Sequence, residues 1–388
     1  MLRWRRGRVT AVRRAWPGAV ELDVDVEDPL GGPTRSSRAL AHPPLVGSPG
    51  PGDAVLLNTS ALDRGLGTGG YALVVALPDR LPADPPPGPG HVVKARYTPL
   101  QAMLLGVDEQ ESPHHRLLAE ADDLGGLPVV VADLHSALPA ILAGARSRPG
   151  GAGLRAVYVM TDGGALPVWF SRAVAGLREA GWLAGTVTVG QAFGGDLEAV
   201  TVHSGLLAAR HVLGADLVVV TQGPGNLGTG TRWGFSGVAA GEAVNAGAVL
   251  GGRPVACLRI SAADARERHS GVSHHSLTAY GRVALAVADV VLPLLEGRPG
   301  VDLGFATRVR DQAATLVRPG GRHRLVEVPV DGFDAALRAS PVPLSTMGRG
   351  LDEDPAGFLA AAAAGWHAAD LVLPPPSEGA SSVVLAPG

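Results

Sequence analysis

The chain has 388 residues, 46% of them hydrophobic and 18% charged, and a formal net charge of −3. This length allows two or three domains whose cores need no covalent support. Cys257 is the only cysteine, which excludes an internal disulfide and a four-cysteine zinc or iron–sulfur site. No apolar run approaches the ~20 residues of a membrane span, and the Arg-rich start lacks the apolar core of a signal peptide. We therefore expect a cytoplasmic protein that has no membrane contact.

Residues 1–81 are predicted to form a small β-barrel of SH3 or OB type. Short runs rich in Val, Leu and Thr at 8–12, 20–26, 54–58 and 71–76 alternate with Gly, Pro and Asp turn signals. The glycine-rich loop around Thr68 and Gly69 is either a simple hairpin or an arm that reaches over the next domain. The basic start is either a solvated edge strand or a contact for RNA, through Arg3, Arg5, Arg6 and Arg8.

A Pro/Gly-rich linker at 82–90 separates the barrel from a predicted α/β domain at 91–370. Strands are expected at 128–132, 156–160, 186–189, 217–220 and 254–260, and helices at 137–146, 168–180, 197–212 and 235–250. This alternation predicts a doubly wound, mainly parallel, Rossmann-like sheet. Further along, we expect helices at 303–317 and 355–370, a strand at 324–330, a loop at 344–355 that folds back to the sheet edge, and a disordered tail at 371–388.

The unusual residues of the chain follow the predicted strands. Their loops are residues 132–139, 161–167, 190–198, 221–231 and 259–276. Because parallel strands bring their carboxyl ends to one edge of the sheet, these loops should meet there, where ligands bind in such folds.

The loop at 221–231 is rich in glycine and matches G-x-G-x-x-G at Gly223, Gly225 and Gly228. A dinucleotide fingerprint would follow the first strand and would have an acid about 20 residues further on. This loop follows the fourth strand and lacks that acid, so NAD or FAD is not expected. A nest of N–H groups for an anion, completed by Asn226, Thr229 and Thr231, competes with a purely structural turn.

The segment 259–276 concentrates charged and imidazole side chains, and three interpretations compete. The histidines could bind a divalent metal together with a carboxylate. One histidine could instead act as general acid or base while the arginines hold an anionic substrate, or the side chains could simply satisfy the loop backbone. The candidate residues are Arg259, Asp264, Arg266, Arg268, His269, His274 and His275.

Two further positions are candidates. Asp162 ends a predicted strand and is either an active-site carboxylate or the cap of the helix that begins near Pro167. Lys94 is the only lysine of the chain, and it is either an anion ligand or an ordinary charge at the edge of a strand. The sequence contains neither a P-loop motif nor a G-x-S-x-G nucleophile elbow, which argues against those enzyme classes.

The sequence resembles a bacterial family defined only as domain of unknown function 3866. The resemblance rests on LLNTSALDRGLGTGGY, KARYTPLQ, LHSALP, MTDGGALP, GQAFGGDLEAV, GPGNLGTGT, RISAADARERHSGVSHHS and STMGRGLDEDP. It implies no activity, cofactor or catalytic residue. The resemblance implies that Asp133 replaces a residue whose carboxylate side chain is longer. If a metal were bound at that position, the shorter side chain would need the ligand to be shifted.

The leading hypothesis is an enzyme, a hydrolase or transferase, that binds a small anionic or nucleotide-like ligand at the sheet edge. Asp162, His269, His274 and His275 would handle protons or a metal. The alternative is a non-catalytic ligand sensor whose basic barrel contacts RNA or protein. A homo-oligomer is compatible with either hypothesis.

Overall fold

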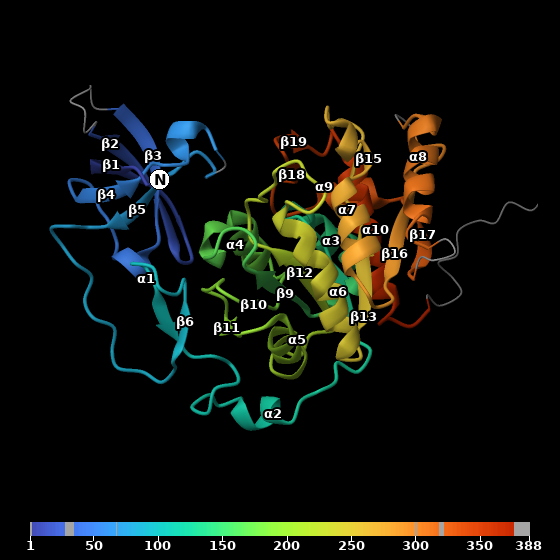
Figure 1. Cartoon of the computed structure of the whole chain (residues 1–388), viewed down its shortest axis with the longest axis horizontal. Helices are drawn as coiled ribbons and strands as arrows, with labels where there is room; N and C mark the ends of the chain where they lie inside the picture. The colour runs from blue at the N-terminus through green and yellow to red at the C-terminus, as the bar shows by residue number, and fades with distance from the viewer. Residues whose placement is uncertain (1, 28–34, 67, 299–300, 318–321, 376–388) are drawn as a thin grey trace, which may run out of the picture.

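A computed structural model describes residues 2–27, 35–66, 68–298, 301–317 and 322–375 of the chain. Two units lie side by side in Figure 1, a five-stranded barrel and a larger α/β unit built on an eight-stranded sheet. Trp16 links them, since its Nε1 donates a 2.7 Å hydrogen bond to the carbonyl of Trp169. Within the described ranges, no helix is both long and apolar enough to cross a bilayer.

The barrel is closed, with strand order β1-β2-β3-β5-β4. Alternating residues of β2 point inward, so that Leu22 and Val24 are fully buried and Asp23 is only half-buried. This period of two is the expected pattern of a strand with one buried face. The strand bounds are Trp4–Trp16 (β1), Ala19–Val26 (β2), Arg35–Ala41 (β3), Ala54–Asn58 (β4) and Ala72–Ala76 (β5), and the short helix α1 (Pro43–Val46) adds Val46 to the core.

The segment between the two units contains little regular structure. Residues 82–88 are exposed and belong to no helix or strand. β6 (Val92–Lys94) and β7 (Ala102–Leu104) then form a small antiparallel pair, and α2 (His115–Ala119) follows.

The large sheet has the strand order β11-β10-β9-β12-β8-β13-β16-β17, and every pair in it is parallel. All residues of β8 and β12 are buried, which explains their unbroken Val runs, because a parallel sheet is covered on both faces. The bounds are Pro128–Val131 (β8), Ala156–Thr161 (β9), Gly185–Thr188 (β10), Leu197–Glu198 (β11), Leu217–Gln222 (β12), Arg253–Cys257 (β13), Asp289–Leu294 (β16) and Arg324–Pro329 (β17).

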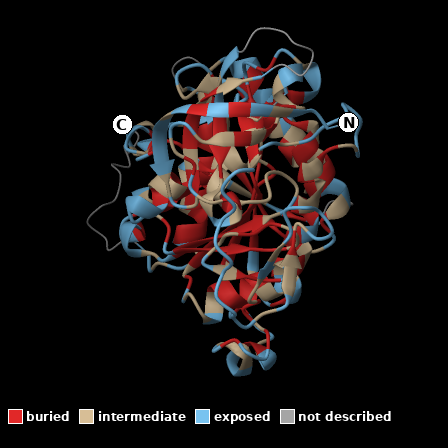
Figure 2. Ribbon diagram, turned by 90° about the vertical axis from the view of Figure 1, so that its left-hand side faces the viewer, coloured by how far each residue is buried: buried red, intermediate tan, exposed pale blue. Residues whose placement is uncertain are grey.

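Helices cover both faces of the sheet (Figure 1). One group contains α3 (Leu138–Ser147), α9 (Phe333–Arg338) and α10 (Pro355–Asp370), and the other contains α5 (Val202–His211) and α6 (Ala239–Val249). α3 and α10 pack closely because a Cβ on Gly144 would collide with the carbonyl of Ala362, and one on Gly365 with the carbonyl of Ile141. The remaining helices are α4 (Arg172–Glu179), α7 (His274–Thr278) and α8 (Leu303–Ala314). Figure 2 shows the buried residues concentrated in the strands and the helices beside them.

These findings support a mixed α/β fold with an N-terminal barrel, and they correct several predicted elements. The predicted helix 197–212 is wrong in its first turn, because Leu197 and Glu198 pair with β10 and the helix begins at Val202. β3, β11 and β16 were not predicted as strands. The predicted helix at 355–370 coincides with α10. Of the predicted disordered tail, residues 376–388 lie outside the described residues.

Candidate functional site

A group of polar side chains lies at the carboxyl edge of the sheet, supplied by the loops that follow β8 and β13. Asp133 comes two residues after the end of β8, and Arg259 two residues after the end of β13. The chain then forms a small antiparallel pair, β14 (Ile260–Ser261) with β15 (Gly271–Val272). This pair folds the loop 262–270 back so that His269 lies beside the start of α7.

Three imidazoles form the centre of the site. His269 ends a single 3₁₀ turn, and His274 and His275 open α7. One ring nitrogen from each lies within 4.8 Å of the others, which makes this a group that could hold a metal ion. Phe235, from the end of the glycine-rich loop, stacks on His275 with ring centroids 3.8 Å apart. The sequence therefore brings the three rings together locally, and Phe235 covers one side of the cluster.

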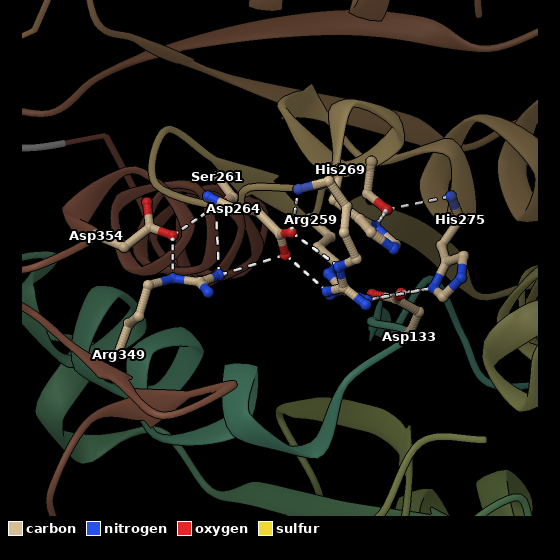
Figure 3. A network of polar contacts seen from close by, with 10 residues as sticks. Asp133, Arg259, Ser261, Asp264, His269, His275, Arg349 and Asp354 are labelled. Atoms are coloured by element: carbon tan, nitrogen blue, oxygen red, sulfur yellow. Dashed lines mark hydrogen bonds and ion pairs between the residues drawn. The ribbon is translucent and has the colours of Figure 1, made fainter. Parts of the chain in front are cut away.

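Hydrogen bonds orient two of the rings (Figure 3). His269 Nδ1 lies 2.8 Å from Ser273 Oγ, which also caps α7 by accepting from the His275 amide. His275 Nδ1 lies 3.2 Å from Arg259 Nη1 and 3.5 Å from Asp133 Oδ2. The His275 ring thus accepts a hydrogen bond from Arg259 in the tautomer that leaves Nδ1 unprotonated, and it lies near Asp133 without a hydrogen bond to it.

Two buried polar atoms of this site have no hydrogen-bond partner among the described residues: Nε2 of His274 and Oδ2 of Asp133. The Asp133 side chain is 3% exposed and lies 3.9 Å from Arg259 Nη1, a distance at which the charges attract without a direct hydrogen bond. Buried polar atoms are rarely left unpaired. These two atoms are therefore available to a ligand or an ion.

His269 and His274 are neutral at physiological pH. Burial, followed by the positive charges of Arg259 and Arg266, lowers the pKa of His269 to about 3. Burial, followed by the neighbouring His275 and Arg268, lowers the pKa of His274 to about 4. A neutral imidazole keeps one lone pair, so these rings can act as ligands or as bases.

Beside the histidines lies a second network, which is closed on itself (Figure 3). Asp264 accepts hydrogen bonds of 2.9 and 2.7 Å from the Arg266 guanidinium and lies 3.5 Å from Arg349, which bonds Asp354 at 3.0 Å. Asp354 also accepts from Ser261 Oγ. The hydrogen bonds from Arg266 hold the pKa of Asp264 well below its usual range. Asp264 and Arg266 thus neutralise each other, in contrast to the predicted role in holding a ligand.

Arg268 lies differently from Arg266. It is exposed, takes part in no ion pair among the described residues, and its guanidinium lies against Gly230 of the glycine-rich loop. It therefore remains a candidate for an anion contact.

The glycine-rich loop folds largely on itself. The Thr229 amide donates to the Gly234 carbonyl at 2.7 Å, Ser236 Oγ donates to Asn226 Oδ1, and the hydroxyls of Thr229 and Thr231 lie 3.1 Å apart. These side chains build the loop and are not free. In the described part of the chain, the N–H groups of Gly225, Asn226 and Gly228 have no partner, whereas that of Gly223 donates to Thr161.

A cavity of about 460 Å³ adjoins this loop. Its walls come from the loops after β8 and β12 and from Ser345, Thr346 and Met347. Ser136 Oγ donates to Thr346 Oγ1 at 3.0 Å, which confirms that the loop 344–355 folds back to the sheet edge. A smaller space, between the loops after β8 and β13 and lined also by Thr346 and Met347, reaches Asp133 and Arg259.

Two predicted site residues lie away from the histidines and make structural contacts. Lys94 is fully buried, and its Nζ donates to the carbonyls of Ala192 and Ala199 at 3.0 and 2.8 Å. Asp162 is exposed and accepts from the Gln191 amide at 2.8 Å; it does not cap a helix, because Ser171 is the N-cap of α4. Neither side chain belongs to the group of three imidazoles.

The predicted set omits Asp133, although it follows a buried strand just as Asp162 does. The predicted RNA contacts at the start of the chain are largely engaged: Arg3 and Arg5 pair with Asp63, and Arg8 donates to the Gly52 carbonyl. Arg6 is exposed.

Comparison with known proteins identifies the family. Residues 38–365 match the family model described as protein of unknown function (DUF3866), and the chain belongs to this family. No curated protein and no solved structure matches the chain significantly.

Proposed function

We propose that the protein is a metal-dependent enzyme that acts on a small anionic substrate by hydrolysis or group transfer. Membership of the family assigns no activity, so this proposal rests on the site alone. His269, His274 and His275 would hold the metal. The observation that carries this proposal is the cluster itself: one ring nitrogen from each of three imidazoles lies within 4.8 Å of the others, and one ring has a buried Nε2 that has no partner among the described residues.

The donor set fits a divalent transition metal. Imidazole nitrogens suit zinc, copper, iron and nickel, and three histidines leave a tetrahedral ion one open position, as in catalytic zinc sites. Ligands about 2.1 Å from such an ion lie about 3.4 Å from one another. The present nitrogens lie up to 4.8 Å apart, so small rotations of the rings would have to close the site around an ion.

The surrounding groups also suit a metal. A metal-bound imidazole commonly donates its second N–H to a carboxylate or another oxygen, which fixes its orientation. Asp133 Oδ2 can accept from His275 Nδ1, and Ser273 Oγ from His269 Nδ1, which leaves Nε2 of each ring for the ion. In this tautomer Arg259 would no longer donate to His275, and its guanidinium would be free for a substrate.

The charges favour an anionic substrate. Imidazoles that bind a metal do so in their neutral form, and Asp133 offsets Arg259, so a divalent cation would leave the site with a net positive charge. A bound divalent ion would supply Lewis acidity. Arg259 would attract and orient the anion, and Asp133, through Oδ2, would hold the His275 proton in place. Arg268 and the free N–H groups of Gly225 and Asn226 would contact more distant parts of the substrate.

We also infer that the sheet is doubly wound in the Rossmann-like manner. α3 follows β8 on the face covered by α10, whereas α6 follows the adjacent β12 and packs with α5. The loops after β8 and β12 would then diverge to opposite faces, and the crevice between them is where open α/β sheets bind ligands. This inference supports the cavity of about 460 Å³ as the substrate site.

Metal analysis tests the proposal directly. The freshly purified protein, and protein reconstituted separately with zinc, iron, manganese, cobalt or nickel, would be examined by elemental analysis and native mass spectrometry. We expect one equivalent of metal per chain, lost in the double variant His274→Ala/His275→Ala. His203→Ala is the matched control, because His203 is an exposed histidine of α5.

The control variant should retain the metal, and both variants should give the same far-ultraviolet circular dichroism spectrum. Protein that takes up none of the five ions stoichiometrically would contradict the proposal. So would a double variant that binds metal as well as the unmodified chain does.

A further inference from the structure

A second large cavity lies between the barrel and the α/β unit, with a volume of about 500 Å³. The barrel contributes Leu40 and Leu73, the loop after β9 contributes Leu166, and the glycine-rich loop contributes Pro224 and Leu227. Its walls therefore come from parts of the chain that only the docking of the two units brings together. A volume of 300–1,000 Å³ is typical of small-molecule sites.

The walls of this cavity carry no charge. None of the lining residues is Asp, Glu, Lys or Arg. The one titratable side chain in the lining is that of His42. Burial lowers the pKa of His42, whose Nδ1 lies 3.0 Å from the Gly18 carbonyl. Another cavity near the barrel differs, because Arg178, Glu179 and Asp196 line it. An ionic ligand would thus lose its hydration at these walls without gaining a partner.

One polar atom in the walls has no partner. Thr68 Oγ1 is buried and makes no hydrogen bond to any described residue. An unsatisfied buried hydroxyl destabilises a fold, and it can both donate and accept. A ligand that carries a single hydrogen-bonding group next to Thr68 would satisfy it. The sequence raised the alternative that Thr68 reaches over the next domain, and Thr68 does line a cavity shared with that unit.

We propose that this interdomain cavity binds an uncharged, mainly apolar small molecule through its aliphatic and aromatic walls and one hydrogen bond to Thr68. Three observations combine here: the size of the cavity, the absence of charge in its lining, and the unpaired hydroxyl. The site is separate from the three histidines and does not depend on the proposed metal. It shares Pro224 and Gly225 with the cavity beside the candidate site.

The probe for a direct test is N-phenyl-1-naphthylamine, an apolar dye that is uncharged at neutral pH, carries one N–H donor and fluoresces on entering an apolar site. The full chain would be titrated in buffer that contains EDTA, so that metal binding plays no part. We expect saturable binding of one dye per chain. Thr68→Val should weaken it about fivefold, the loss of one hydrogen bond of ordinary strength. Thr68→Ser, which keeps the hydroxyl, should restore it.

Variants of the walls complete the test. Leu73→Trp fills the cavity and should weaken dye binding at least tenfold. Leu100→Glu places a charge in the lining and should also weaken dye binding. Because Leu100 is 36% exposed, the fold should tolerate this change, and the variant replaces Leu73→Trp in the test if Leu73→Trp does not fold. The matched controls are Val249→Trp and Leu303→Glu, at positions that are 73% and 67% exposed and lie outside the cavity.

The controls should bind dye like the unmodified chain. The proposal is overturned if the dye shows no saturable binding, or if the folded wall variants bind it as tightly as the controls do. Because the chelator is present throughout, either result is independent of the outcome of the metal analysis.

Discussion

Replacing Lys94 by methionine should destabilise the protein severely, because this lysine anchors β6 to the large sheet. Its side chain is fully buried, and Nζ donates to the backbone carbonyls of Thr188, Ala192 and Ala199. Nζ also lies 3.6 Å from Glu198 Oε2. Burial lowers the pKa of Lys94 and raises that of Glu198, so each group depends on its partner. Methionine fills a similar volume but removes the donor of these carbonyls and leaves the buried Glu198 carboxylate, which still accepts from Thr188 Oγ1 and the Gly194 amide, without its counter-charge.

Removing one partner of a buried ion pair costs about 3–5 kcal/mol of unfolding free energy. We expect Lys94→Met to fall in this range when urea unfolding is followed by circular dichroism. Adding Glu198→Gln removes the unpaired charge, so the double variant should recover about 1–2 kcal/mol relative to Lys94→Met alone. A cost below about 1 kcal/mol for Lys94→Met would refute the anchoring role, given that exposed pairs are typically worth that little. Strict additivity of the two changes would refute the coupling.

Three further predictions concern packing, acid stability and the histidine cluster. In a urea titration, Gly144→Ala should cost about 1–3 kcal/mol of unfolding free energy, because the added methyl would overpack α3 against α10. Gly153→Ala is the control and should leave the unfolding free energy unchanged, because nothing lies within 4 Å of its Cβ position. Burial alone would raise the pKa of Asp289, but hydrogen bonds from His367 and Arg324 hold it below its ordinary value of 3.8. The stability gained from these bonds is present above pH 3.8 and is lost as the pH falls through the lower pKa of the folded state. The melting temperature should therefore fall more steeply between pH 5 and pH 3 for the unmodified chain than for Asp289→Asn. Parallel curves of melting temperature against pH would contradict this. Asp133→Asn should weaken zinc binding about 10–100-fold in competition with a chelating dye, and unchanged affinity would show that Asp133 does not orient His275.

The fold of the α/β unit was largely predictable from the sequence. The Val runs of β8 and β12 identify strands buried on both faces, and the alternation with helices identifies a parallel sheet. The bounds of α10 follow from Pro355 at its first turn and the alanine-rich stretch after it. One error falls where the local signal is weak: β11 has two residues, and only its pairing with Val187 and Thr188 makes it a strand. The missed β16, in contrast, is an apolar run, DVVLPL, whose local signal is strong.

The candidate site was predictable only in part. His269, His274 and His275 are close in sequence, so their meeting requires one folded loop and little else. Asp133 and Arg259 come from different strands, and parallel pairing of β8 with β13 brings them to the same edge. The sequence indicates that edge, but it does not indicate which side chains touch.

The sequence by itself thus determined the sheet, the edge where polar loops gather and the three neighbouring imidazoles, because hydrophobic patterning and short-range chain geometry are local properties. Only the tertiary structure decided which charges are free. Asp264 and Arg266 are neutralised in a network completed by Arg349 and Asp354 from the far end of the chain. The Lys94 ammonium donates to backbone carbonyls of a distant loop and is therefore not free to bind a ligand. Whether a charged group can bind a ligand depends on its burial and on its partners in space, and long-range packing sets both.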